Sequence, residues 1–240
     1  MINRLISRLS LLMSIALFSF SCSNKIPKTL SNGYQLVYQE SFDDESTIAG
    51  YEFSDNDFWK YNAENGKSGS LECTGKSAYV PPVRSPHSMA LIEAKQFGSF
   101  IMEVDLQQTG RVYPHQDMCV FFGVQDDSHF YYTHISKAMD DHANNVFIVN
   151  GEPRIKISTK TNDGQNWEPQ KWHKIRLERN IESGMIKLFF DDMNEPVMTA
   201  MDKSFGAGGI GFGSFDDSGK IDNIRIWSKD PVTTGKSLFK

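Results

Sequence analysis

Four short runs in the C-terminal half decide the fold. They read Trp172-His173-Lys174-Ile175-Arg176-Leu177, Gly184-Met185-Ile186-Lys187-Leu188-Phe189-Phe190-Asp191-Asp192, Gly209-Ile210-Gly211-Phe212 and Asp222-Asn223-Ile224-Arg225-Ile226. Each run has the length of a strand, and turn-forming Gly, Asn, Asp and Pro residues separate such runs along the chain. Long amphipathic helical patterns are nearly absent. The spacing predicts an all-β sandwich of two antiparallel sheets rather than alternating βαβ units.

Similar runs recur upstream. The predicted strands are 35–40, 59–63, 70–74, 89–92, 99–107, 118–124, 130–135, 145–149, 154–159, 173–179, 185–190, 197–201, 209–214 and 220–227. Alternate residues of a strand share a face. We therefore expect Tyr132 and His134 on one face of their strand and Tyr131 on the other, with Arg154 and Lys156 sharing a face. Strands 99–107, 130–135 and 154–159 are each expected to have one apolar and one polar face.

The N-terminus has the pattern of a secretory signal. Residues 1–21 combine a basic start, Arg4 and Arg8, with a short apolar core, and Cys22 follows at once. This resembles a bacterial lipoprotein signal, which implies cleavage and lipidation at Cys22. The alternative is ordinary cleavage nearby. The sequence thus predicts a signal peptide (1–21), a lipidated tether (22–33), one domain (34–228) and a tail (229–240), with a lipid anchor at the outer membrane, facing the periplasm.

Charge and cysteine content limit the classes of function. The net charge is −5 and becomes −7 without Arg4 and Arg8, so nucleic acid is not an expected partner and an anionic ligand needs a local basic patch. The membrane is expected as a partner only through the lipid anchor. Cys119 lies in an apolar strand and is predicted to be a buried free thiol. A Cys73–Cys119 disulfide is the alternative, and no zinc spacing is present.

The candidate site lies between Tyr113 and Lys156, which hold four of the six histidines, at 115, 129, 134 and 142. Proton donors, proton acceptors and cations are therefore concentrated on a few neighbouring strands. This composition favours acid–base chemistry on a carboxylated substrate. The alternative is a hydrated sheet face that only binds a sugar.

The four C-terminal runs, with Glu40-Ser41-Phe42-Asp43-Asp44 near the start, resemble the concanavalin A-like (laminin G-type) jelly roll of lectins, glucanases and polysaccharide lyases. The segment from Phe130 to Lys156, with Tyr131-Tyr132-Thr133-His134 and Asp141-His142-Ala143-Asn144-Asn145, resembles lipoproteins of marine polysaccharide-degrading bacteria. Within that group it is similar to ulvan oligosaccharide dehydratases, which remove water from a non-reducing-end uronic acid. The fold resemblance also implies a structural calcium ion, with Glu40 and Asp222 as oxygen ligands.

Such an elimination needs a base for the C5 proton, an acid for the group leaving C4, and a cation for the carboxylate. Tyr132 and His134 are the predicted acid and base in either order, with His115 or His142 as alternative bases. Arg154 and Lys156 are expected to hold the carboxylate. The remaining predicted substrate-binding residues are Asn145, Tyr131 and Lys137. No cofactor is required for this chemistry, and the expected partner is an acidic oligosaccharide.

Three alternatives remain open. An endo-acting polysaccharide lyase would use the same elimination with a sugar as the leaving group. A glucanase would need a second carboxylate after Glu103 and Asp105, where glutamine stands at 107 and 108. A non-catalytic lectin would stack sugar rings on Trp167, Tyr113 and Tyr131. Two further residues are read as structural, His173 as the start of a strand and Asp217 as part of a hairpin turn.

Overall fold

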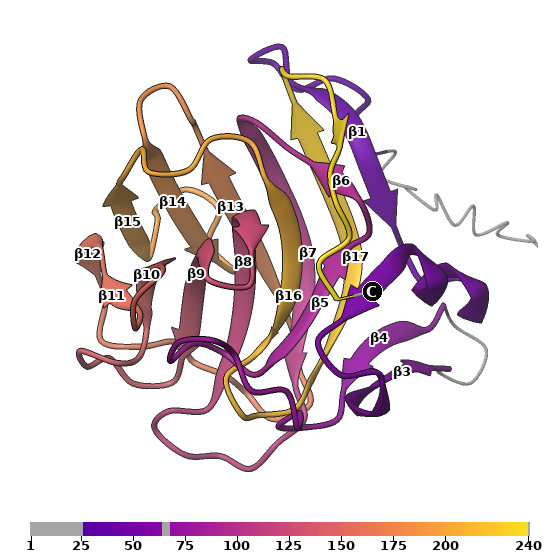
Figure 1. Cartoon of the computed structure of the whole chain (residues 1–240), viewed down its shortest axis with the longest axis vertical. Helices are drawn as coiled ribbons and strands as arrows, with labels where there is room; N and C mark the ends of the chain where they lie inside the picture. The colour runs from indigo at the N-terminus through magenta and orange to yellow at the C-terminus, as the bar shows by residue number, and fades with distance from the viewer. Residues whose placement is uncertain (1–25, 64–67, 240) are drawn as a thin grey trace, which may run out of the picture.

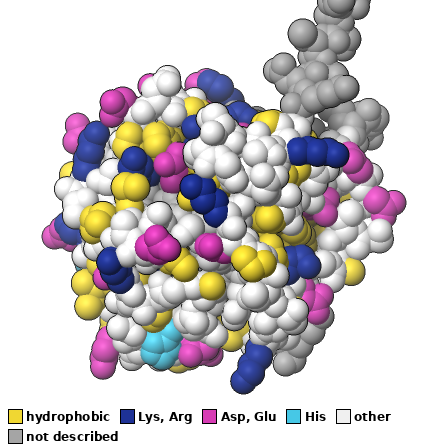
Figure 2. All heavy atoms as spheres, turned by 90° about the horizontal axis from the view of Figure 1, so that it is seen from above, with side chains coloured by type: hydrophobic (Ala, Val, Ile, Leu, Met, Phe, Trp, Pro, Cys, Tyr) yellow, Lys and Arg dark blue, Asp and Glu magenta, His cyan; other side chains and the backbone are white. Residues whose placement is uncertain are grey.

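The structure, a computed structural model, describes residues 26–63 and 68–239. The predicted signal segment and Cys22 lie outside these residues. None of the helices in the described ranges is long and apolar enough to cross a membrane. On the face shown in Figure 2, Lys and Arg side chains are interspersed with Asp and Glu and form no broad basic patch.

Two large antiparallel sheets pack face to face (Figure 1). The nine-stranded sheet contains β1 (Gln35–Glu40), β3 (Trp59–Asn62), β4 (Ser70–Cys73), β7 (Phe100–Gln108), β12 (Ser158–Thr161), β13 (Trp172–Arg179), β14 (Met185–Phe190), β15 (Met198–Met201) and β17 (Gly219–Ser228). The seven-stranded sheet has the order β11 (Ile155–Lys156), β10 (Asn145–Asn150), β9 (His129–Ser136), β8 (Asp117–Asp126), β16 (Gly209–Ser214), β5 (Ser88–Ile92) and β2 (Tyr51–Phe53). The short pair β6 (Lys95–Gln96) and β18 (Thr233–Thr234), and the 3-10 helices η1 (Glu45–Gly50) and η2 (Asn56–Phe58), complete the fold. The predicted all-β sandwich is confirmed.

The main core lies between the two sheets. On β7, Met102, Val104 and Leu106 are buried, whereas Glu103 and Asp105 point outward and are half-buried. The face expected for each of these residues is therefore confirmed. The β-strand period of two puts one apolar row of every strand into this layer, which removes the largest apolar area from water.

The outer face of the seven-stranded sheet is not the polar face that the sequence predicted for strand 130–135. Strands β8, β9 and β10 are buried on both faces, and a second apolar cluster includes Leu91, Phe121, Phe130 and Tyr132. Two segments cover it, residues 79–87 and residues 233–239; Val83, Leu238 and Phe239 pack against the cluster. Side chains on this face are therefore shielded from solvent by chain segments distant in sequence.

Two further expectations need correction, and a third is confirmed. The predicted strand 154–159 is divided at Ile157, because β11 pairs with β10 of one sheet and β12 with β15 of the other. The connection 215–218 joins β16 to β17 in different sheets, so it is not a hairpin turn. Cys73 and Cys119 are both buried and free, which confirms the thiol at Cys119 and excludes the alternative disulfide.

Candidate functional site

Strand β9 places Tyr132 and His134 on the outer face of the seven-stranded sheet. Both rings lie against Phe147 of β10, with centroids 5.2 Å and 6.3 Å away, respectively. Tyr131 points into the core between the sheets instead. The predicted sharing of faces is confirmed, but the outer-face pair is covered: Tyr132 has no exposed surface and His134 only 4%.

The guanidinium of Arg154 links these side chains. Its Nη1 donates to the Tyr132 hydroxyl at 2.7 Å, and its Nη2 donates to the backbone oxygen of His142 at 3.0 Å. The guanidinium carbon lies over the rings of Phe147 and Phe215, at 4.8 Å and 4.5 Å from their centroids. Within residues 26–63 and 68–239, Arg154 has no carboxylate at ion-pair distance. Its positive charge is thus held by aromatic faces and neutral oxygens rather than neutralised.

We call Arg154, Tyr132, His134, Phe147 and Phe215 the Arg154 centre. A cleft of about 280 Å³ adjoins it, lined by residues 80–85, His87 and Phe215. His87 packs edge-on against Phe215, with centroids 5.5 Å apart. The backbone N–H of Arg154 donates to the Arg84 oxygen at 3.2 Å, which attaches the segment 79–87 to the centre.

A charged rim surrounds the centre. Nε2 of His115 lies 2.7 Å from an Asp140 oxygen, and the other oxygen accepts the backbone N–H of His142. Lys156 contacts Asp141 at 2.6 Å. The predicted residues His142, His115 and Lys156 are all exposed. His142 lies on the acidic loop 140–142, and His115 and Lys156 contact that loop from the segment before β8 and from β11.

Two buried acids lie beneath the centre. Nε2 of His134 is 3.7 Å from Asp117, whose oxygens accept hydrogen bonds from Ser214, from the Phe215 N–H and from the Cys119 thiol. Asp217 accepts from the Tyr113 hydroxyl at 2.7 Å and from the Asp117 N–H at 3.0 Å. Burial, and then the charge of Asp217, raises the pKa of Asp117 to about 8. Asp117 is therefore largely protonated at neutral pH.

Burial also sets the protonation of Tyr132 and His134. It raises the pKa of Tyr132 well above 10, against the opposing effect of Arg154. It lowers the pKa of His134 to about 3, with the Arg154 charge as the next cause. Both side chains are thus neutral at neutral pH. Among the described residues, Nδ1 of His134 has no hydrogen-bond partner, although it is buried.

Other predicted site residues have structural contacts. The Tyr131 hydroxyl donates to Asp202 and accepts the Phe205 N–H, inside the sandwich. Asn145 donates to the backbone oxygens of Asp140 and Ala143 and so shapes the loop below His142. Lys137 follows β9, and its backbone N–H bonds to Gln116. Tyr131 is therefore separated from the Arg154 centre by the sheet itself.

Residues expected to serve the lectin and hydrolase alternatives lie elsewhere. Trp167 is fully buried, and its Nε1 donates to the Ile135 oxygen at 3.0 Å, so it has no face to offer a sugar. Glu103 is paired with Arg176 on the nine-stranded sheet. His173 is buried against Trp167 and Phe190 and contacts Asp191 at 2.8 Å, a structural arrangement.

The expected calcium ligands Glu40 and Asp222 both accept hydrogen bonds from neighbouring residues, and calcium binding by them stays a prediction. One Glu40 oxygen accepts the backbone N–H groups of Ser41 and Phe42, and the Asp222 oxygens accept from Asn223. A different acidic group, Asp117, Asp216 and Asp217, has ligand atoms within 4.8 Å of one another in the described part of the chain. Hydrogen bonds already engage both Asp117 oxygens, and calcium prefers 6–8 oxygen ligands.

Sequence reasoning missed His87, Arg84 and Phe215 at the cleft and Asp117 beneath it. Arg84 and His87 fall in the run Pro81-Pro82-Val83-Arg84-Ser85-Pro86-His87. A proline-rich run with a cation and a histidine was the available signal, since prolines fix an extended loop that can lie over a sheet.

Comparison with solved structures identifies the fold as a concanavalin A-like jelly roll. A carbohydrate-binding module, CBM66, from Bacillus subtilis superposes with a TM-score of 0.53 at 16% identity, covering 75% of this chain and 96% of that one. A Bacillus subtilis protein of unknown function with a galectin-like fold gives 0.51 at 11% identity, covering 81% and 98%. Winged bean acidic lectin, solved with methyl-α-D-galactose, gives 0.51 at 11% identity, covering 79% and 97%.

Sequence comparisons add nothing to this identification: no family model matches the chain, and no curated protein matches it.

Proposed function

We propose that the protein binds an anionic carbohydrate at the Arg154 centre. The observation that carries the proposal is the Arg154 guanidinium, held between two aromatic rings beside a cleft and without a carboxylate partner in the described residues. The carbohydrate-binding names of two proteins of the same fold agree with it. Fold alone does not specify a ligand, so the argument rests on the site.

The geometry suits a carboxylate or sulfate group on a sugar. A guanidinium has five N–H donors, and the hydrogen bonds to Tyr132 and His142 use two of its nitrogens only in part. The remaining donors can meet a planar anion, and the exposed Arg84 stands at the same cleft. The Phe215 ring supplies an apolar face for a sugar ring.

Calorimetric titration of the mature domain with oligogalacturonate tests this proposal. Arg154→Ala should weaken binding by about tenfold or more, because a charge-assisted hydrogen bond contributes about 1.5–3 kcal/mol. Arg225→Ala is the matched control, since Arg225 is also half-buried but lies on β17 of the other sheet. Equal affinity in wild type and Arg154→Ala, or equal binding of a neutral galactan, would contradict the proposal.

A second candidate is β-elimination on a uronic acid, with an oligosaccharide dehydratase ahead of a chain-cleaving lyase. The meeting of Arg154, Tyr132 and His134 in one centre favours it. Arg154 would neutralise the carboxylate, His134 would take the C5 proton, and the neutral Tyr132 hydroxyl would protonate the oxygen leaving C4. The C5–H and C4–O bonds break, the C4=C5 bond forms, and water or a sugar leaves.

The ultraviolet absorbance of the unsaturated uronate, followed with mass spectrometry, separates these activities. A rise with uronate-ended oligosaccharides and a loss of one water supports the dehydratase. A rise with polymer and shorter chains supports the lyase. Binding without any rise contradicts both and leaves the lectin function.

We further propose that Cys22 is lipidated and anchors the domain at the outer membrane, on the periplasmic side. The support is the sequence pattern of residues 1–22. Labelling cells with a palmitate analogue should mark the wild-type protein and not Cys22→Ser. Equal labelling of both would contradict the anchor.

A further inference from the structure

A single row of paired residues crosses the outer face of the seven-stranded sheet. From β11 to β2 it runs Lys156, Phe147, Tyr132, Phe121, Gly211, Leu91 and Glu52. Partners in antiparallel strands share a face, and strands lie about 4.8 Å apart, so the row is about 29 Å long. The Arg154 centre lies at one end of this row and Glu52 at the other.

Three aromatic rings form the part of the row at its Arg154 end. Phe147, Tyr132 and Phe121 come from adjacent strands, with neighbouring centroids 5.2 Å and 5.9 Å apart. Such a platform runs perpendicular to the strands and offers consecutive apolar faces. In the structure it is covered and reaches no solvent.

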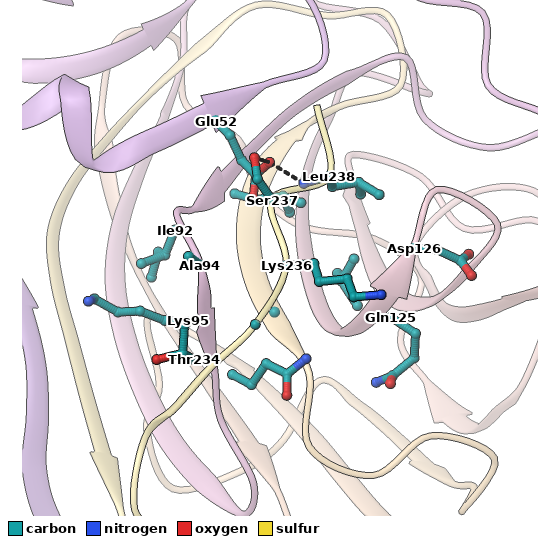
Figure 3. Close-up of a pocket in the computed structure, with 15 residues that line it drawn as sticks. Glu52, Ile92, Ala94, Lys95, Gln125, Asp126, Thr234, Lys236, Ser237 and Leu238 are labelled. Carbon is teal, nitrogen blue, oxygen red and sulfur yellow. Dashed lines mark hydrogen bonds between the residues drawn. The ribbon is translucent and has the colours of Figure 1, made fainter. Parts of the chain in front are cut away.

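Residues 233–239, which we call the strap, cover the Glu52 end of the row. One oxygen of the buried Glu52 carboxylate accepts the N–H of Leu238 from the strap (Figure 3). The same oxygen accepts the hydroxyl of Ser237 and the N–H of Phe239, each at 2.9 Å. Phe239 also packs edge-on against Tyr79, with centroids 5.4 Å apart, so the strap contacts the other covering segment.

The strap spans a hollow rather than a packed layer. A cavity of about 630 Å³ lies between it and the sheet, lined among others by Leu91, Val124, Gln125 and Lys236 (Figure 3). Thr233, Thr234, Lys236 and Ser237 are exposed, and Gly235, Leu238 and Phe239 are half-buried. The strap is held by the β18–β6 pair with the Gly235 N–H bond to the Ala94 oxygen, by the Glu52 carboxylate, and by the packing of Leu238 and Phe239 at its end. Segments with so few buried contacts open at low free energy.

We propose that the strap is releasable, and that its detachment from Glu52 opens the Glu52 end of the row, up to Phe121, as a groove that extends the site for a carbohydrate chain several residues long. This inference rests on the proposed carbohydrate binding. Release frees the Glu52 oxygen, which three donors share when the strap is closed, to accept sugar hydroxyls, and it uncovers the face between Leu91 and Phe121. A short ligand occupies the Arg154 end alone, whereas a long one competes with the strap.

Hydrogen–deuterium exchange tests the release without any ligand. The Leu238 and Phe239 amides should exchange at least about a hundredfold faster than the amides of β8, because local opening exposes them without global unfolding. Glu52→Ala and, separately, Phe239→Ala should increase this exchange further, whereas Glu152→Gln at an exposed acid should not. If the Leu238 and Phe239 amides exchange as slowly as those of β8, the proposed release of the strap is wrong.

Affinities for a galacturonate disaccharide and hexasaccharide test the groove. Glu52→Ala and a deletion of residues 233–240 should each change the hexasaccharide affinity by about tenfold or more relative to wild type, because a closed strap lowers apparent affinity by the open fraction. The deletion should raise it. Disaccharide affinity should stay as in wild type. Equal changes for both ligands overturn the groove. If the strap amides exchange fast but no variant binds either ligand, the groove and the proposed function are both contradicted. The release of the strap itself would still stand.

Discussion

Two buried groups with pKa shifts of opposite direction make the stability of the fold depend on pH. The pKa of Asp117 is raised from 3.8 to about 8, chiefly by burial, so the folded state keeps a proton that the unfolded state releases. The contribution of Asp117 to stability is fully present below pH 3.8 and is lost as the pH rises to about 8. The pKa of His134 is lowered from 6.5 to about 3, again chiefly by burial. Its contribution is lost as the pH falls from 6.5 to about 3.

Each group changes the free energy of unfolding by at most about 1.4 kcal/mol per pH unit. Between pH 3.8 and pH 6.5 the two slopes oppose one another and nearly cancel. Above 6.5 only the Asp117 slope remains, so the free energy of unfolding should fall by about 2 kcal/mol up to pH 8. Burial also raises the pKa of Asp217, which acts in the same direction.

Urea denaturation of the mature domain between about pH 5 and about pH 8 measures these slopes. Asp117→Asn should flatten the fall above pH 6.5, and Asp217→Asn should reduce it. His134→Gln should let the fall begin at lower pH, because the opposing slope is gone. The assignment of this slope to Asp117 would be refuted if the stability of the wild type stayed constant or rose between pH 6.5 and pH 8. An equal slope in Asp117→Asn would refute it too.

Three further predictions concern single side chains. Tyr132→Phe removes the oxygen that accepts from Arg154 and should lower the free energy of unfolding by about 1 kcal/mol, whereas Tyr61→Phe on β3 should change it less, as thermal melts would show. Trp167→Ala should lower stability by about 3–5 kcal/mol and leave the sugar affinity of the folded protein unchanged, since Trp167 is fully buried; weakened binding at full folding would contradict this. The thiols of Cys73 and Cys119 should react with a disulfide reagent only on unfolding, because burial raises the pKa of Cys73 to about 11 and that of Cys119 well above 9; rapid labelling of the native protein would be the contrary result.

Local pattern was enough to place many strands. The predicted ranges 35–40, 185–190 and 209–214 coincide with β1, β14 and β16. Strand periodicity also assigned Tyr132 and His134 to one face and Tyr131 to the other. Both inferences depend only on neighbours along the chain, where turn residues and side-chain alternation are visible.

The cover of the outer face depends on contacts between distant segments. Glu52 meets Leu238 and Phe239, which are more than 180 positions away, and the sequence indicated only a C-terminal tail there. Trp167 was expected to stack on a sugar ring in the lectin alternative, yet it fills the core against Phe190. Asp217 reads as a turn residue, yet it accepts from Tyr113 and the Asp117 amide. In each case burial is determined by which sheets pack together, and periodicity carries no information on that.

Binding and elimination make different demands on His134. A binder needs it neutral, so that it does not repel Arg154, and burial provides this. An elimination catalyst needs it basic enough to take a proton from carbon, and a pKa of about 3 is far from that optimum. The positive charge of Arg154 is one cause of the low value. An anionic sugar on Arg154 would offset that charge and raise the pKa of His134, whereas a neutral sugar would not.

Nitrogen NMR titration of His134 with oligogalacturonate and with neutral galactan measures this coupling. A pKa of His134 that rises only with the acidic ligand places the anion at Arg154 and shows that the ligand itself prepares the base. An unchanged pKa of His134 with the acidic ligand bound would mean that the anion lies away from Arg154. An anion at hydrogen-bond distance from the guanidinium offsets its charge, and this must shift the pKa of a buried neighbour.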